Sequence, residues 1–181
     1  TITINDAELT PQTYTLIVYK QPKKTTKYDT LEDLKDEEEL KNDIYYVTTE
    51  SDKISKDILD LLNKNKLKLY YNIENENKGL LYQIVIPYGE YTTDINPTIT
   101  RSATSPLTLT TELPAGIPVM IYVGDIYADN TDLKVYTYNE IGTYTDLTTS
   151  VRVVDGYVNI TTNGEKNYVF SGQNMIAGGF N

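Results

Sequence analysis

Short β-prone runs separated by turn residues fill the sequence beyond residue 97, and they restrict the possible folds more than any other feature. Asp155-Gly156 and Asn163-Gly164 lie between the last three runs, and such dipeptides are the strongest short signals for a hairpin turn. No helical periodicity appears there. About six to eight strands in about 90 residues is the size of an immunoglobulin-like or jelly-roll-like β-sandwich, which we expect for residues 98–181. The expected strands are 107–111, 117–123, 133–138, 150–154, 157–161 and 167–171.

The first 88 residues alternate between strand and helix patterns, so we expect a small α+β domain in that half. Its best-defined helix follows Ser51, the expected cap, and has apolar residues at the spacing of one helix face: Ile54, Ile58, Leu61 and Leu62. A shorter helix is predicted after Asp29 or Thr30, with Leu31 and Leu34 on its apolar side. The expected strands are 12–19 and 43–49 and a hairpin of 66–73 with 80–87, and residues 20–27 are expected to form a basic loop.

Charge is distributed unevenly along the chain. Residues 1–90 hold 17 of the 26 acids and 12 of the 16 bases, and the second half is sparse in charge. This shift coincides with the change in periodicity. We therefore predict a mainly β, α+β protein with two separate folding units, residues 1–88 and 98–181, joined by a linker at 89–97.

Histidine and cysteine are both absent. A Ser-His-Asp triad, a histidine-held metal, a thiolate nucleophile and a disulfide are therefore impossible in this chain. A hydrolase that needs only two carboxylates stays open, although the sequence gives no way to choose a pair. We expect a protein that is not an enzyme and needs no cofactor.

Tyrosine occurs 17 times and phenylalanine only twice. A ring that packs at one edge and meets water at the other suits half-exposed sheets and protein interfaces. The net charge of −10 repels nucleic acid and anionic membranes. The composition therefore favours protein partners, and we expect synthesis in the cytoplasm because no signal peptide is recognisable.

One loop between two expected strands is rich in carboxylates. Asp125, Asp129 and Asp132 crowd it, and calcium binds several oxygen ligands from such loops. The spacing does not match an EF-hand, and turns collect Asp and Asn for structural reasons. A solvated turn and a cation site are the two interpretations.

The segment 172–181 is uncharged and apolar, and it includes Met175, Ile176 and Phe180. It is either a final strand, a disordered end or an arm that adds to a neighbouring subunit. We expect these three side chains to bind a partner, because burying each large apolar side chain is worth roughly 1.5–3 kcal/mol.

Residues 28–34 (YDTLEDL) and 42–48 (NDIYYVT) carry a local resemblance to phage proteins. Together they resemble a pattern in phage fibre and virion-surface proteins, in which T-x-x-D-L leads through a short spacer into G-D-x-Y-x-V. Asn42 stands where that pattern usually has Gly. The Thr-, Tyr- and Asn-rich second half is also similar to the β domains that decorate phage heads and tails.

This resemblance implies a structural, non-catalytic protein located in a phage virion and made in the host cytoplasm, either a capsid decoration (auxiliary) protein or a fibre protein such as a head fibre. Its partners would be other virion proteins, such as the major capsid protein, or further copies of itself. A carbohydrate-binding or adhesion module that uses loop tyrosines is the alternative.

Overall fold

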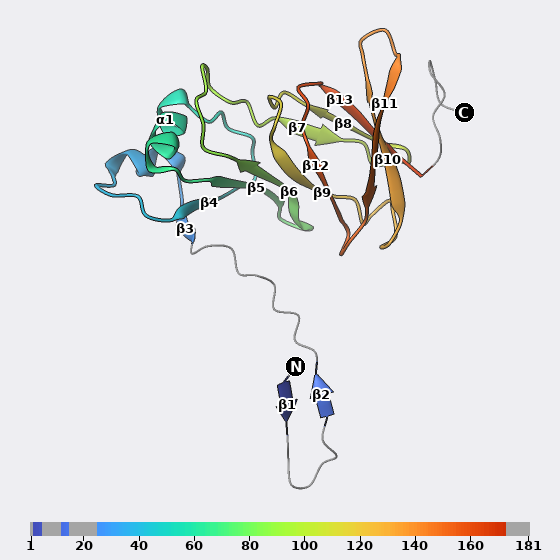
Figure 1. Cartoon of the computed structure of the whole chain (residues 1–181), viewed down its shortest axis with the longest axis horizontal. Coiled ribbons are helices and arrows are strands. Elements are labelled where there is room, and N and C mark those ends of the chain that lie inside the picture. Colours follow the sequence, from blue (N-terminus) through green and yellow to red (C-terminus); the bar gives the residue numbers. More distant parts are fainter. Residues whose placement is uncertain (1, 5–11, 15–24, 173–181) are drawn as a thin grey trace.

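The computed structural model describes residues 25–172 and two short strands, β1 (Ile2–Ile4) and β2 (Gln12–Tyr14), which pair antiparallel. Residues 25–172 are mainly β and form a six-stranded sheet of order β12-β9-β6-β5-β4-β3 and a five-stranded sheet of order β11-β10-β13-β8-β7 (Figure 1). The expectation of a mainly β protein is therefore confirmed, and the two sheets are consistent with a β-sandwich. None of the helices in the described residues is long and apolar enough to span a bilayer.

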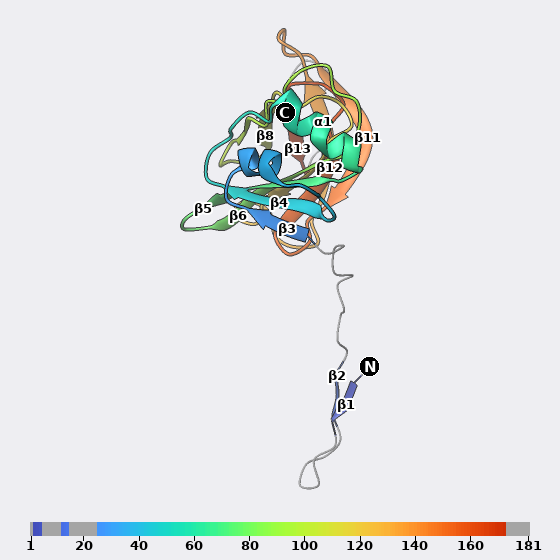
Figure 2. The same ribbon diagram turned by 90° about the vertical axis from the view of Figure 1, so that its left-hand side faces the viewer.

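The α+β part begins with three strands that run parallel. They are β3 (Thr25–Tyr28), β4 (Asp43–Thr48) and β5 (Leu69–Asn75). The short 3-10 helix η1 (Leu31–Asp36) and the helix α1 (Lys56–Asn65) connect them and lie on one face of the sheet (Figures 1 and 2). Parallel neighbours need such crossovers, which is why helix and strand patterns alternate here.

Helix α1 starts later than the sequence predicts. Its cap is Ser55, whose side chain accepts a hydrogen bond from the amide of Ile58, and not Ser51. Ile54 instead exchanges backbone hydrogen bonds with Ile95, both 2.9 Å long. A contact distant in sequence therefore holds the residues before Ser55 extended, and no local pattern reveals it.

The predicted hairpin of β5 with β6 (Gly79–Ile86) is confirmed. Strand β6 also pairs on its other side with β9 (Pro118–Tyr122), which lies beyond the expected linker. The six-stranded sheet is therefore continuous across 89–97. Separate folding of 1–88 and 98–181 stays a prediction, but this pairing argues against it.

Most of the strands expected in the second half are present. β8 (Leu107–Thr111), β12 (Tyr157–Thr161) and β13 (Asn167–Ser171) have the predicted bounds. β10 (Asp132–Tyr138) lies close to its predicted bounds, whereas β11 (Tyr144–Arg152) starts earlier and ends before Val153.

Two short strands lie in segments for which the sequence gives no strand signal. They are β3, which overlaps the end of the expected basic loop, and β7 (Ile99–Arg101). Both are sheet edges and are defined by pairing with β4 and β8 rather than by an apolar pattern of their own.

The two glycine turns have different roles. Asp155 and Gly156 both have positive φ, 53° and 84°, and Val154 and Tyr157 exchange hydrogen bonds around them, as in a two-residue hairpin turn. Asn163-Gly164 does not close a hairpin, because β12 and β13 belong to different sheets. The dipeptide predicts a turn correctly, but the turn passes from one sheet to the other.

A single core joins the two sheets and the helices. Its fully buried members come from both halves of the sequence and include Leu62, Tyr71, Ile84, Ile121 and Phe170. The inner face of the six-stranded sheet is thus covered by α1 and η1 over one part and by the five-stranded sheet over the other.

Candidate functional site

The outer face of the six-stranded sheet, turned away from the core, is the strongest candidate site. Strand register places Tyr45, Tyr70 and Val85 side by side on β4, β5 and β6. A second row runs across five strands: Val47, Asn72, Gln83, Met120 and Asn159. Tyr122 and Tyr157 form a further pair on β9 and β12. We call these ten residues the tyrosine face.

The ten residues of the tyrosine face carry no charge, although the chain as a whole has 42 charged residues. Charge begins at the margins of this face, where the exposed Lys27 of β3 pairs with Tyr45 and Glu74 acts on Tyr157. Tyr45, Tyr70, Val85 and Met120 are half-buried, whereas their inward-facing neighbours are fully buried. Figures 1 and 2 show α1 and η1 on the opposite side of the sheet, and no described helix or strand lies over the tyrosine face. An uncharged sheet face with partly exposed tyrosines has the composition of the centre of a protein interface.

A buried amide network fixes the middle of the tyrosine face. Asn72 is 0 % exposed, and its Nδ2 donates to the carbonyl oxygens of Tyr46 and Tyr70, each at 3.1 Å. Its Oδ1 accepts a hydrogen bond of 2.9 Å from Nε2 of Gln83. Because each polar atom of the buried Asn72 side chain has a partner, the network holds β4, β5 and β6 in one register and leaves no unpaired polar group under the tyrosine face.

Replacing Asn72 with alanine is expected to lower the free energy of unfolding by about 1–3 kcal/mol, because the Gln83 amide and two carbonyls lose a buried partner. Chemical denaturation measures the loss. The matched control is Asn159→Ala on the same face, where the side chain is exposed and a change within about 0.5 kcal/mol is expected. Equal effects of the two substitutions would contradict this role of the network.

Tyr122 and Tyr157 close the face at the β12 edge. Their rings meet edge to face with centroids 5.4 Å apart, and the Tyr157 hydroxyl donates to the carbonyl of Leu80 at 2.7 Å. Gly124 and Gly156 lie against the Tyr122 ring, where a Cβ would come within 2.9 and 3.0 Å of it. Glycine at both positions therefore lets the turn approach this ring pair closely.

The structure uses the three candidate metal ligands in other ways. Asp125 pairs with Arg101 and lies 3.8 Å from Nζ of Lys78. Asp129 accepts the amide of Gly156 at 2.8 Å, and Asp132 forms a two-point ion pair with Arg152. Within the described residues, no three carboxylates converge on a point where they could share a cation.

Burial raises the pKa of the Asp125 carboxyl, but the hydrogen bond and charge of Arg101, helped by Lys78, outweigh it and hold that pKa below its usual value. The hydrogen bond from Arg152 likewise lowers the pKa of Asp132. Both groups are therefore held ionised by basic partners, which is the environment of a structural ion pair rather than that of a general acid.

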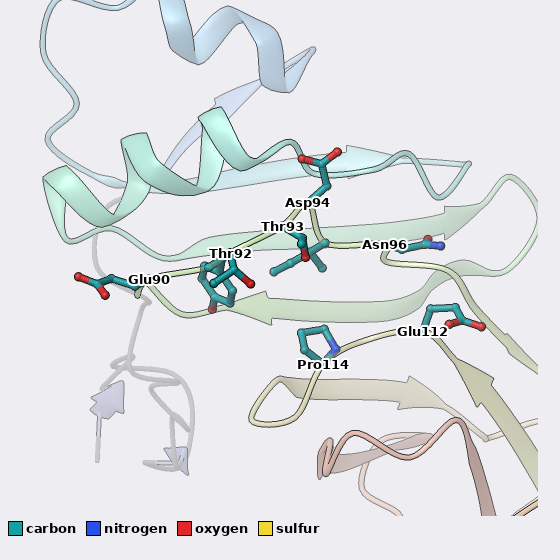
Figure 3. A pocket seen from close by; sticks show the side chains of 9 residues that line it. Glu90, Thr92, Thr93, Asp94, Asn96, Glu112 and Pro114 are labelled. Atoms are coloured by element: carbon teal, nitrogen blue, oxygen red, sulfur yellow. The ribbon is translucent and has the colours of Figure 1, made fainter.

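A hollow of about 360 Å³ lies beside the loop that follows β6 (Figure 3). Tyr91 and Thr93 line it, together with the acids Glu90, Asp94 and Glu112. Figure 3 shows these three carboxyl groups pointing away from one another, and Asp94 accepts the amide of Lys56 at 2.8 Å. The hollow thus offers an aromatic ring and hydroxyls, but not the facing pair of carboxylates that glycoside hydrolysis needs.

Met175, Ile176 and Phe180, the residues expected to bind a partner, lie outside the described residues. The sequence pattern did not reveal the tyrosine face, because its members belong to five strands that are distant in sequence. The excess of tyrosine over phenylalanine was the one signal that pointed to such a surface.

Comparison of the chain with models of known protein families, with curated proteins and with solved structures finds no match.

Proposed function

We propose that this protein is a non-enzymatic structural protein that docks on a larger particle through its tyrosine face. The observation that carries the proposal is a patch of ten uncharged residues across β4, β5, β6, β9 and β12, with charge only at its margins, in a chain with a net charge of −10. Exposed sheet faces of a monomer are normally polar on their solvent side, so an uncharged patch with partly exposed tyrosines at the centre of such a face indicates a covering partner. The partner would present an apolar, uncharged surface of its own.

The particle we propose is a phage virion. Support comes from the resemblance of residues 28–34 and 42–48 to phage fibre and virion-surface proteins. Many weak, identical contacts on a symmetric particle add up to strong attachment, so each single face needs only modest affinity. An immunoglobulin-like or jelly-roll-like type for the second half belongs to the same proposal, since the sheet order alone fits a broader class of sandwiches.

The test is incorporation into purified particles of variants that change one side chain. Val85→Lys places a charge on the tyrosine face, whereas Val154→Lys makes the same change at a valine that is 56 % exposed elsewhere. We expect Val85→Lys to lower the amount of chain per particle by roughly tenfold, because a charge must then be desolvated at the contact. The thermal unfolding midpoints should stay close to that of the parent chain, since lysine can extend its amine to water.

Two results would count against the docking proposal. One is a chain that sediments separately from particles under all conditions. The other is equal incorporation of Val85→Lys and Val154→Lys, which would move the contact to another surface.

A carbohydrate-binding or adhesion function is the second candidate, and the loop hollow favours it. The Tyr91 hydroxyl donates to the carbonyl of Pro87 at 2.7 Å, which fixes the ring beside Thr92 and Thr93. A fixed aromatic ring next to hydroxyl groups suits a sugar ring. A glycan array probed with the parent chain and with Tyr91→Ala tests it: binding that this substitution removes would support adhesion.

A further inference from the structure

A second uncharged surface adjoins the tyrosine face where the two sheets open apart, and the two surfaces share Asn159. Strands β11 and β12 follow each other through the Asp155-Gly156 turn but belong to different sheets, so their facing edges diverge from that turn. The groove between them has a volume of about 490 Å³. Its apolar side chains are Val135, Leu147, Val151, Ile160 and Tyr168, and we call it the edge groove.

A bulge in β11 directs one of these side chains into the edge groove. The register of β11 against β10 passes from Asp146 to Thr149, so Leu147 and Thr148 have no partner residue on β10. Thr148 has a φ of 54°, and its amide donates to Oδ1 of Asp146 at 2.7 Å. The bulge turns Leu147 toward the core while leaving it half-buried.

The edge groove has the properties of a site for an added strand. Within the described residues, β11 pairs only with β10 and β12 only with β9, so each has one edge without a strand partner. None of the ten residues that line the groove is charged. Sheet edges are usually protected by charged side chains, and an uncharged one accepts an extended peptide through its backbone groups.

The chain carries a segment of matching chemistry. Residues 173–181 contain no charge and offer Met175, Ile176 and Phe180 as apolar anchors. Strand β13 ends immediately before this segment: Ser171 pairs with Lys134, which pairs with Ser150 on the wall of the edge groove. We infer that the edge groove binds residues 173–181 of a second copy of this chain.

The distance from the end of β13 to the edge groove favours binding of residues 173–181 from a second copy over binding of the chain's own residues 173–181. A strand added at the free edge of β11 lies three strand spacings from β13, about 14 Å, so the chain needs at least about four extended residues after Ser171 to reach it. Within one chain those residues would include Met175, which then could not enter the groove. A second copy can place all three anchors there.

Charge favours contact at this place. Two copies with a net charge of −10 each repel one another over most of their surfaces. The edge groove and residues 173–181 are both uncharged, so their contact avoids that repulsion and desolvates no ionised side chain.

Sedimentation velocity of the full chain over a range of concentrations provides the test. We expect reversible self-association that is weakened roughly tenfold or more by Thr161→Lys, which charges the groove rim. The matched control is Thr100→Lys, also an exposed threonine on an edge strand but remote in sheet order from the groove. The double substitution Ile176→Asp, Phe180→Asp should weaken association by the same factor, because it charges the bound segment instead of the groove.

Mixing decides whether the contact joins two chains. Thr161→Lys keeps an intact segment 173–181, and the double variant keeps an intact groove, so we expect the two together to form a one-to-one complex although neither associates alone. Circular dichroism of each variant confirms that it is folded.

The inference is overturned if the parent chain stays monomeric, if Thr161→Lys and Thr100→Lys associate alike, or if the mixture fails to form the complex. A monomer whose melting temperature falls when residues 173–181 are altered would show that the chain fills its own groove. The docking proposal is independent of these outcomes, since it is tested at Val85 on the tyrosine face.

Discussion

Raising the pH from about 10 to about 12 is expected to unfold this protein through its tyrosines. Burial raises the pKa of Tyr71 well above its usual value, and the neighbouring Tyr46 and Asp52 add to this, although a hydrogen bond from the Asp52 backbone opposes it. Burial also raises the pKa of other tyrosines, namely Tyr82, Tyr91, Tyr157 and Tyr168. In the folded chain these phenols therefore stay neutral at a pH at which the unfolded chain ionises them.

The sign follows from proton linkage. The folded pKa lies above the unfolded value of about 10, so the full stability is present below that pH and is lost as the pH rises toward the folded pKa. Each such tyrosine lowers the free energy of unfolding by about 1.4 kcal/mol for every pH unit in that window. Tyr71, whose pKa is raised most, dominates this loss, and the other raised tyrosines act in the same direction against a stability of about 5–15 kcal/mol for an ordinary domain.

Tyr71→Phe separates ionisation from packing. Tyr71 is 0 % exposed, and its hydroxyl accepts the amide of Asp52 at 2.9 Å, so the variant should lose about 1 kcal/mol near neutral pH. It should also lose stability less steeply above pH of about 10, because one titrating group is gone. Urea denaturation at a series of pH values measures both, and parallel curves for the two chains would rule out Tyr71 as a source of the alkaline transition.

Replacing Ile121 with alanine is expected to destabilise both halves of the chain together. Ile121 is 0 % exposed on β9 and stands opposite Tyr82 of β6 and Val158 of β12. Truncating a buried isoleucine typically costs about 2–5 kcal/mol. Because β6 and β9 belong to one sheet over one core, the loss should reach α1, which lies in the other half of the sequence.

Hydrogen exchange followed by mass spectrometry is the measurement. Peptides from α1 and from β13 should lose protection by the same factor in Ile121→Ala, and limited proteolysis should leave one resistant fragment. Val154→Ala, at an exposed valine, serves as the control and should change neither. The contrary result is that α1 keeps its protection while β13 loses it, and that proteases cut within 88–97. That result would contradict a single cooperative unit and support two folding units joined at 89–97.

Local sequence determined the elements whose geometry depends on neighbouring residues. Helix α1 follows from the spacing of Ile58 and Leu62, the β5–β6 hairpin from alternation, and the turn at Asp155-Gly156 from two residues that tolerate positive φ. Composition by itself also excluded whole classes of catalytic chemistry, because the chain has neither histidine nor cysteine.

Tertiary structure alone decided how these elements combine. The capping of α1 by Ser55, the strand character of β3 and the continuity of the sheet through β6 and β9 all depend on partners far away in sequence. The tyrosine face is decided in the same way: Tyr45, Tyr70 and Val85 become neighbours only when three strands pair in one register. The amino-acid composition could indicate such a surface because it depends only on which residues the chain contains. Which strands pair depends on contacts between residues distant in sequence, and burial of the shared core fixes that pairing.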